Sequence, residues 1–395
     1  MAELVKKICI LGGGFGGLYT ALRLNELSWQ EGEKPEITLV DKSDRFLFSP
    51  LLYELITEEM QTWEIAPPYS ELLADTEIKF IQDQVTNIDI SNQQVTLAHH
   101  SPLEYNRLVI GLGGLTPINI VKGAKEYAIP FRTLEDAYQL KNKLRNLENS
   151  DQDKIRVVIV GGGYSGVELA VKIADRLGNR GKIRIVDRGE EILRQSPQFN
   201  QKKAQEALTA RQIWLDLETE VEEITKDTVS LAYKGKVDQI PVDIVLWTVG
   251  TTGIKLVDKL SLPQNQQGKL QINEMLQVEN HPQIFALGDL VECYDDDGKL
   301  LPANAQVAFQ QADYCAWNVW ASLENKPLLP FKFQPLGEML ALGVDDATLS
   351  GLGLNLDGNL AYLTRRLIYL YRLPTLKHKL SVGLNWLLSP LLNVV

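Results

Sequence analysis

The chain has 395 residues, of which 45% are hydrophobic and 23% are charged, a composition that suits two or three globular domains. Its formal net charge of −11 argues against a general nucleic-acid binder, because no domain-wide basic field exists to collect phosphates. Cys9, Cys293 and Cys315 have no metal or disulfide spacing, and no signal peptide precedes the first apolar segment, so a protein that faces the cytosol is expected.

The N-terminal region has the pattern of a β-α-β unit. The apolar run Ile8–Leu11 predicts a strand, residues 18–24 have the apolar spacing of a helix, and a second predicted strand, Ile37–Val40, ends at an aspartate. Residues 156–187 repeat this plan, again with an aspartate after the second strand. The sequence therefore predicts two copies of one architectural unit.

Each unit carries a Gly-x-Gly-x-x-Gly pattern between strand and helix, first at Gly12–Gly17 and then at Gly161–Gly166. The first glycine permits a tight turn, the second lets the backbone approach a pyrophosphate, and the third lets the helix pack close to the strand. The helix N-terminus attracts phosphates, and Asp41 or Asp187 would accept a hydrogen bond from a ribose hydroxyl. Two such sites predict a flavin, a nicotinamide nucleotide and an electron-transfer enzyme.

A third landmark is the predicted strand Ile284–Asp289, which ends in Gly-Asp. It resembles the second FAD motif of the flavoproteins with two dinucleotide-binding domains, whose aspartate holds the ribityl chain. In that family the N-terminal fingerprint binds FAD and the inserted one binds NAD(P)H. Leu108–Gly113 and Leu246–Gly250 resemble the two strands that cross between the domains, although Leu112 stands where threonine is usual.

The resemblance implies an α/β fold with two Rossmann-like domains, of the glutathione-reductase-like type, in which the NAD(P)H domain is inserted into the FAD domain. The FAD domain would comprise residues 1–120 and 256–325, and the NAD(P)H domain residues 121–255. Residues 326–395 would form a C-terminal segment that associates with a membrane.

Two segments indicate the electron acceptor. Phe46–Glu54, FLFSPLLYE, has no cysteine for thiol chemistry and looks like the F-L-F-T-P-L-L segment of type II NAD(P)H:quinone oxidoreductases, which lies along the flavin. Ala305–Gln311 resembles the A-Q-x-A-x-Q signature of that family, whose glutamines lie between flavin and quinone. Without this resemblance, the second segment would more readily be interpreted as an amphipathic helix with surface amides.

Four stretches, 57–68, 161–170, 246–252 and 334–343, look like the cyanobacterial and plastid branch that is associated with demethylphylloquinone reduction in phylloquinone synthesis. The implied function is hydride transfer from NAD(P)H to FAD and transfer of two electrons to a membrane quinone, such as demethylphylloquinone. The alternatives are a respiratory-type NADH:plastoquinone oxidoreductase, a redox-sensing flavoprotein module, and a reductase of ferredoxin or rubredoxin.

The resemblance also implies individual roles. Glu168 would lie near nicotinamide and flavin, and Gln306, Phe309 and Gln310 would contact the quinone, with the two glutamines and Glu168 as catalytic residues; on residues alone, Glu168 could instead be an acid favoured by the helix dipole. No metal is expected. The expected cofactor-binding residues are Gly12, Gly14, Phe15, Gly16, Gly17, Asp41, Lys42, Phe48, Ser49, Pro50, Val85, Gly113, Gly161, Gly163, Tyr164, Ser165, Gly166, Asp187, Arg188, Gly250, Gly288, Asp289 and Gln306.

Coenzyme choice depends on two adjacent residues. Asp187 would accept from the free 2′-hydroxyl of NADH and repel the 2′-phosphate of NADPH, whereas Arg188 could pair with that phosphate. The branch resemblance favours NADPH, with NADH also usable.

The C-terminal tail, 358–395, contains five Lys or Arg residues and no Asp or Glu. Leucine stripes predict two amphipathic helices, interrupted at Pro374 and Pro390 and each too short to cross a bilayer, with Arg365, Arg366 and Arg372 opposite the first stripe. We expect them to lie in a membrane interface on the cytoplasmic side, in a thylakoid or plasma membrane if the source is cyanobacterial. The alternative is a helical hairpin packed on the core or on a second subunit; the family resemblance suggests a homodimer.

Overall fold

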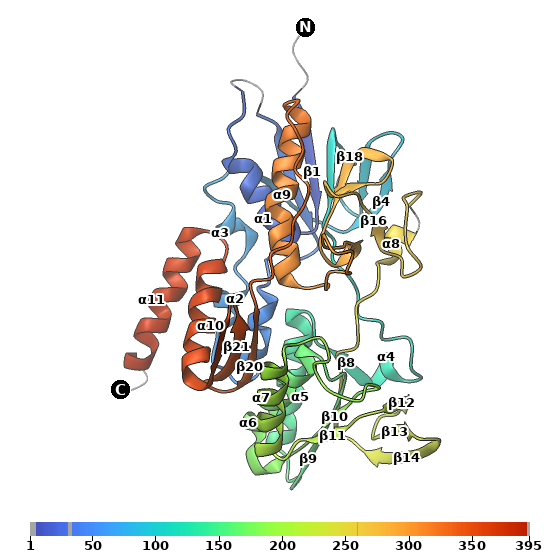
Figure 1. Ribbon diagram of the computed structural model, residues 1–395, viewed down its shortest axis with the longest axis vertical. Coiled ribbons are helices and arrows are strands. Elements are labelled where there is room, and N and C mark those ends of the chain that lie inside the picture. The colour runs from blue at the N-terminus through green and yellow to red at the C-terminus, as the bar shows by residue number, and fades with distance from the viewer. Residues whose placement is uncertain (1–4, 31–33, 259, 393–395) are drawn as a thin grey trace. The chain divides into compact units, whose positions relative to one another are not determined.

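A computed structural model describes residues 5–30, 34–258 and 260–392 (Figure 1). The chain forms two compact units. The first comprises Met1–Phe48, Ala66–Leu115 and Thr251–Gln334, and the second Ser49–Ile65, Thr116–Gly250 and Pro335–Val395. The unit that contains the second glycine loop thus also includes the C-terminal segment Pro335–Val395 and the short segment Ser49–Ile65.

The first unit is built on a six-stranded sheet in the order β17-β18-β7-β1-β2-β3. Its strands are β1 (Lys7–Leu11), β2 (Glu36–Asp41), β3 (Lys79–Gln82), β7 (Arg107–Ile110), β17 (Gln277–Val278) and β18 (His281–Ala286). Neighbouring strands are parallel except β17 and β18. The central strand β1 is buried from Ile8 to Leu11, as expected for a parallel strand that is covered on both faces.

Two helices, α1 (Phe15–Glu26) and α9 (Ala305–Leu323), lie side by side in this unit (Figure 1). An ion pair of 2.7 Å between Arg23 and Asp313 joins them. Asn304 caps α9, because its side chain accepts from the backbone N–H of Val307 at 2.9 Å. Smaller elements complete the unit: β4 (Val85–Asp89), β5 (Gln94–Leu97), β6 (Leu103–Glu104), β16 (Leu270–Gln271), β19 (Val291–Glu292), α3 (Tyr69–Leu72), α8 (Lys255–Asp258) and the 3₁₀ turn η3 (Gly288–Leu290).

The second unit contains a five-stranded parallel sheet in the order β11-β10-β9-β15-β8. Its strands are β8 (Ala128–Pro130), β9 (Ile155–Val160), β10 (Gly181–Val186), β11 (Trp214–Asp216) and β15 (Ile244–Trp247). The long helices are α5 (Leu134–Glu148), α6 (Tyr164–Leu177) and α7 (Gln198–Ala210). A three-stranded antiparallel sheet, β12 (Thr219–Ile224), β13 (Thr228–Tyr233) and β14 (Lys236–Pro241), follows β11.

The N-terminal piece of this unit folds as the 3₁₀ helix η1 (Ser49–Leu55) and the short helix α2 (Thr62–Ile65), and η1 packs against α5 and α6. Short α4 (Ala124–Tyr127) and η2 (Gly178–Arg180) complete the elements before the C-terminal part. The predicted α/β class with two Rossmann-like units is confirmed.

The C-terminal part begins with an antiparallel sheet that the sequence did not indicate, β20 (Glu338–Gly343), β21 (Asp346–Gly351) and β22 (Leu354–Asp357). It continues into α10 (Gly358–Arg372), which packs on β21, and α11 (Leu376–Leu392). Pro374 separates the two helices as predicted. The prediction that Pro390 interrupts the second helix is wrong, because α11 runs on to Leu392. A proline so close to a helix end costs few backbone hydrogen bonds.

The leucine stripes of α10 and α11 face outward. Leu360, Leu363 and Leu367 on the first helix and Leu380 and Leu384 on the second are all more than half exposed. Within the described residues, no helix combines the length and the apolar character needed to cross a bilayer.

The inward face of the tail is polar. Asn385 and Trp386 donate to the carboxylate of Glu64 at 3.1 and 2.7 Å, and the ring of the buried His378 lies 2.8 Å from the backbone oxygen of Glu64. Arg365 lies opposite the stripe, as predicted, and it is fully buried there.

Candidate functional site

The first glycine loop joins β1 to α1. Gly12 has a φ of +94°, and a Cβ there would lie 2.4 Å from the carbonyl oxygen of Gly111, so only glycine fits. A Cβ on Gly17 would lie 1.8 Å from the carbonyl oxygen of Gly12. At Gly14, no described atom beyond its chain neighbours lies within 4 Å of the corresponding position. The loop thus packs tightly on its strand and leaves open space at the N-terminus of α1, where a phosphate would bind.

The second glycine loop, between β9 and α6, repeats this construction. Gly161 has a φ of +113°, and a Cβ on Gly166 would lie 1.8 Å from the carbonyl oxygen of Gly161. Gly163, like Gly14, is surrounded by open space as far as the described residues go. Both loops therefore fit a dinucleotide whose pyrophosphate approaches the backbone at the middle glycine.

An aspartate at the end of the second strand braces each loop. Asp41 accepts from the backbone N–H of Gly13 at 2.6 Å and from that of Ser43 at 2.8 Å. Asp187 accepts from the N–H of Gly162 and from that of Gly189, both at 2.7 Å. The carboxylates predicted to bind ribose therefore also fix the shape of the loops, and their role at a ribose stays a prediction.

The Gly-Asp turn follows β18 and is held by α9. Gly288 has a φ of +80°, and its N–H donates to the side-chain oxygen of the buried Gln311 at 2.8 Å. A Cβ on Gly114 would lie 3.5 Å from the Cβ of Asp289, which brings the first crossing strand beside the turn. The Gly-Asp turn therefore lies at the end of the first predicted crossing strand, Leu108–Gly113.

Aromatic side chains connect the start of α1 to the FLF segment. The ring of Phe15 packs edge-on against Phe46 and Phe48, at centroid distances of 5.3 and 5.2 Å. Tyr19 contacts Phe309 of α9 at 4.7 Å. Phe48 and Phe309, which the sequence assigned to flavin and quinone, thus belong to one aromatic cluster in the first unit.

The two predicted quinone glutamines differ in their surroundings. The amide of Gln310 donates to the backbone oxygen of Gln334 and accepts from its N–H, both at 2.9 Å. This pairing gives Gln310 a structural role that the sequence did not predict, because it fixes the chain after α9. Gln306 is half-buried one turn earlier. Quinone binding by either residue stays a prediction.

Glu168 lies on the first turns of α6 and is almost fully buried. One carboxylate oxygen accepts from the N–H of Ala341 on β20 at 2.9 Å and lies 3.6 Å from Arg365 of α10. Burial raises the pKa of Glu168 to about 7, although Arg365 opposes this rise. Glu168 is therefore a group that exchanges a proton near neutral pH.

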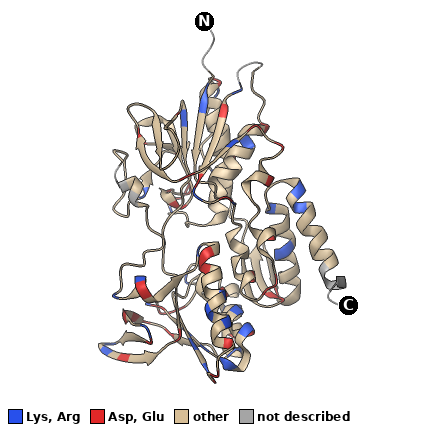
Figure 2. Ribbon diagram, turned by 180° about the vertical axis from the view of Figure 1, so that it is seen from behind, with Lys and Arg blue, Asp and Glu red and all other residues tan. Residues whose placement is uncertain are grey.

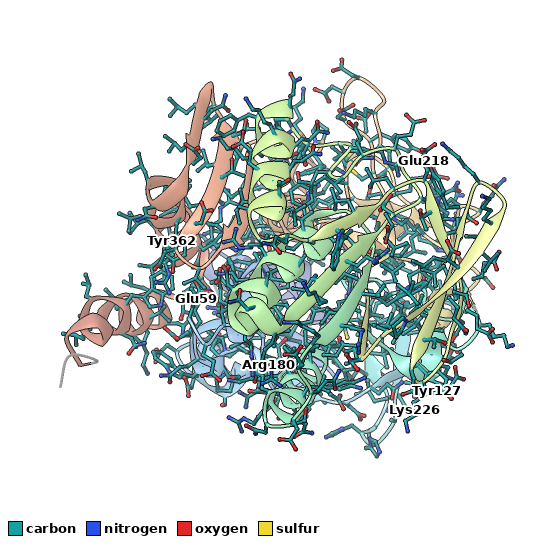
Figure 3. All side chains as sticks on the ribbon, turned by 90° about the horizontal axis from the view of Figure 1, so that it is seen from below. Glu59, Tyr127, Arg180, Glu218, Lys226 and Tyr362 are labelled. Carbon is teal, nitrogen blue, oxygen red and sulfur yellow. The ribbon has the colours of Figure 1, made fainter. Side chains whose placement is uncertain are left out.

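Arg365 connects Glu168 to a buried cluster of charged side chains. Its guanidinium donates to Glu54 of η1 at 2.6 Å, and the other oxygen of Glu54 lies 2.5 Å from Lys172 of α6. Lys172 also pairs with Glu59, which is labelled in Figure 3 beside Tyr362, its partner at 3.4 Å. The cluster holds three carboxylates and two cations, almost all removed from solvent.

These charges set the protonation of the cluster. Burial favours the neutral form of Glu54, but Arg365 and Lys172 lower its pKa well below the usual range. Burial and the neighbouring Glu54 raise the pKa of Glu59. Because the carboxylates outnumber the cations by one, Glu59 and Glu168 are the members that hold a proton most readily.

Comparisons with known proteins agree with this geometry. The family described as pyridine nucleotide-disulphide oxidoreductase matches residues 6–312, which include both glycine loops and the Gly-Asp turn. The chain belongs to this family.

Two relatives and one solved structure are similar to this chain over nearly its whole length. Demethylphylloquinone reductase NdbB of Synechocystis sp. is 59% identical and is matched over 99% of this chain and 98% of its own length. Alternative NAD(P)H-ubiquinone oxidoreductase C1 of Arabidopsis thaliana is 43% identical over 96% of this chain and 80% of its own length. The structure of NDH2 from Plasmodium falciparum in complex with NADH has a TM-score of 0.86 at 18% identity and covers 98% of both chains. The resemblance to the type II group and to the demethylphylloquinone reductase branch is confirmed.

In this pyridine nucleotide-disulphide oxidoreductase, the predicted site residues fall into two sets. One set belongs to the first unit: Gly12, Gly14, Phe15, Gly16, Gly17, Asp41, Lys42, Phe48, Val85, Gly113, Gly288, Asp289, Gln306, Phe309 and Gln310. The other set belongs to the second unit: Ser49, Pro50, Gly161, Gly163, Tyr164, Ser165, Gly166, Glu168, Asp187, Arg188 and Gly250.

Sequence reasoning missed Lys172, Glu54, Glu59 and the inward direction of Arg365. One signal was present, because Lys172 interrupts the apolar run Leu169–Ala174 on a helix whose other side chains there are buried. A lysine in such a run needs a buried acid as its partner. The sequence does not say which acid, since Glu54 lies 118 residues away.

Proposed function

We propose that this chain oxidises NAD(P)H through bound FAD and reduces a lipid-soluble quinone, and that its acceptor in the cell is a naphthoquinone such as demethylphylloquinone. The observation that carries the proposal is the presence of two complete dinucleotide loops in one chain, each with open space at its middle glycine. The name of the Synechocystis relative, 59% identical over nearly the full length, supports the naphthoquinone.

The choice of FAD rests on the first unit. The opening at Gly14 and the amide groups at the N-terminus of α1 suit a pyrophosphate, and Asp41 suits an adenosine ribose. Asp289 would hold the ribityl chain at a turn that Gln311 fixes. FAD, when bound, supplies two-electron redox chemistry between nicotinamide and quinone.

The protein contributes binding, orientation and protons. Reduction of a quinone to a quinol consumes two protons, and the raised pKa of Glu168, about 7, lets its carboxyl oxygen hold one at neutral pH. Arg365 orients that carboxylate and limits the rise of its pKa. For the coenzyme we infer NADPH with NADH also usable, because Arg188 follows Asp187 at the end of β10.

We also propose that the tail docks on the cytoplasmic face of a thylakoid or plasma membrane. The outward leucines of α10 and α11 offer an apolar surface, and the two helices carry Lys and Arg without any acid (Figure 2). A quinone dissolved in lipid would be met at such a surface. The family resemblance further suggests a homodimer, in which part of this apolar face would instead be covered by protein.

An acceptor panel tests the proposed function. Purified full-length protein is assayed for NADPH and NADH oxidation with short-chain naphthoquinones, benzoquinones, ferredoxin and no acceptor. We expect stimulation by quinones and the highest kcat/KM with a naphthoquinone. A higher kcat/KM with a plastoquinone analogue would favour a respiratory-type enzyme, and a slow oxidation that no acceptor stimulates would favour a redox-sensing flavoprotein.

A further inference from the structure

A surface cavity of about 340 Å³ lies in the second unit, away from the buried ion cluster. Charged side chains dominate its lining: the cations Arg188 and Lys234, and the carboxylates Glu190, Glu218 and Glu220. Figure 3 labels Glu218 beside the hairpin β13–β14. The cavity is therefore a charged site, in which an anion would meet two cations and three competing acids.

The cavity opens where a nucleotide ribose is expected. β10 ends at Val186, and Asp187 follows as the predicted ribose acceptor. The backbone from Asp187 to Gly189 pairs with the end of β11, through a bond of 3.0 Å from Asp187 N–H to Asp216 and one of 2.9 Å from Glu218 N–H to Gly189. Arg188 and Glu218 are thereby fixed on adjoining segments, beside the position that distinguishes NADPH from NADH.

A tight turn brings Lys234 to the same place. β13 ends at Tyr233 and β14 begins at Lys236, so Lys234 and Gly235 form a two-residue loop with φ values of +47° and +78°. Positive φ at both positions is typical of the type I′ turn of a hairpin. Because Thr219 pairs with Tyr233, the turn lies next to Glu218, and the Nζ of Lys234 is 3.8 Å from its carboxylate.

We propose that Lys234 and Arg188 together bind the 2′-phosphate of NADPH, and that Glu218 sets the coenzyme preference by competing for Lys234. This inference rests on the proposed use of a nicotinamide nucleotide. Arg188 offers a fork of N–H donors that matches phosphate oxygens, and Lys234 adds a point charge from the opposite segment.

The net charge of the cavity lining predicts a moderate preference for NADPH over NADH. With all five groups ionised the cavity carries one net negative charge, so a phosphate must take the place of Glu218 at Lys234. NADH, which has a hydroxyl at this position, leaves that pair intact. Neutralising Lys234 and neutralising Glu218 should therefore change the preference in opposite directions, a result that a merely structural role would not give.

Binding of nucleotide fragments to the full-length holoenzyme tests the proposal. Adenosine 2′,5′-bisphosphate and 5′-AMP, which differ only in the 2′-phosphate, are titrated by calorimetry at low salt. The variants are Lys234→Asn, chosen because Asn tolerates a positive φ, and Glu218→Gln. Lys236→Gln is the matched control, since it removes the same charge from the same hairpin outside the cavity lining.

We expect Lys234→Asn to weaken binding of the bisphosphate by about fivefold and Glu218→Gln to strengthen it by about threefold, with 5′-AMP changed less than about twofold. The ratio of kcat/KM for NADPH to that for NADH should follow the bisphosphate, and Lys236→Gln should move neither. The proposal is overturned if Lys234→Asn changes both fragments equally, or if Glu218→Gln leaves the bisphosphate unaffected. Failure of quinone reduction would not affect this readout, because fragment binding needs no electron acceptor.

Discussion

Replacing Glu168 by Gln should change how the stability of the protein depends on pH. The carboxyl group is buried, and its pKa is raised from 4.5 to about 7 in the folded chain. A raised carboxyl pKa means that the folded state binds this proton more tightly than the unfolded state. Its stabilising contribution is therefore complete below pH 4.5 and is lost as the pH rises through 7.

The size of the effect follows from the shift. At about 1.4 kcal/mol per pKa unit, ionisation of Glu168 removes on the order of 3 kcal/mol of folding free energy between pH 4.5 and pH 8. Gln has the same shape and does not ionise, so Glu168→Gln avoids this loss. Relative to the wild type, the variant should gain stability as the pH rises.

Urea unfolding at pH 5, 6, 7 and 8 gives the free energy of unfolding of the wild type and of Glu168→Gln. The contributions of the other titrating groups largely cancel in the difference between the two proteins. The control is Glu222→Gln, the same chemical change at an exposed position of the second unit. Between pH 5 and pH 8 we expect the gap to widen by about 2.5 kcal/mol for Glu168→Gln, because a small part of the loss has already occurred by pH 5. A gap that stays within about 1 kcal/mol across this range would contradict the prediction, because the Glu168 carboxyl would then titrate alike in the folded and the unfolded states.

Three further predictions concern other parts of the chain. Lys172→Met keeps an unbranched side chain, one heavy atom shorter, but leaves Glu54 and Glu59 without their shared cation, so we expect a loss of about 3–5 kcal/mol in urea unfolding at pH 8, smaller at pH 5 where Glu59 takes a proton. Gly166→Ala should abolish binding of NADH and lower the melting temperature, because its Cβ would lie 1.8 Å from a carbonyl oxygen, whereas Gly163→Ala, with open space, should weaken binding at an unchanged melting temperature. Replacing Leu380 and Leu384 by Gln should reduce flotation with anionic liposomes by at least about tenfold while kcat with a water-soluble naphthoquinone stays the same; equal flotation would point to protein as the partner of this face.

The glycine loops could be predicted from the sequence because their constraints are local. Gly12 and Gly161 are required by the turn in which they lie, and each strand–turn–helix–strand–acid unit spans at most 35 residues, Lys7–Asp41 and Ile155–Asp187. The same holds for the Gly-Asp turn after β18, although its bond to Gln311 depends on a helix that packs back on it.

Pairings across long separations could not be predicted. The leucine stripe of α10 identified an amphipathic helix correctly, but the usual inference, that charged side chains opposite the stripe face water, fails at Arg365. Its partner Glu54 is 311 residues away in sequence, and only the folded chain brings the two together. Likewise, β20, β21 and β22 pair only with one another, and the apolar run Met339–Leu342 in β20 does not by itself indicate which segments it pairs with.

The burial of Arg365 has a consequence for any attempt to obtain a version of this protein that does not bind lipid. Deleting the chain from Asn359 onward would remove the guanidinium from Glu54 and Glu168 and leave the three acids of the cluster with Lys172 as its single cation. The tail is therefore not a detachable module. Loss of enzymatic activity in a truncated form would not show whether the tail binds lipid. Substituting the outward leucines while keeping Arg365 separates solubility from catalysis.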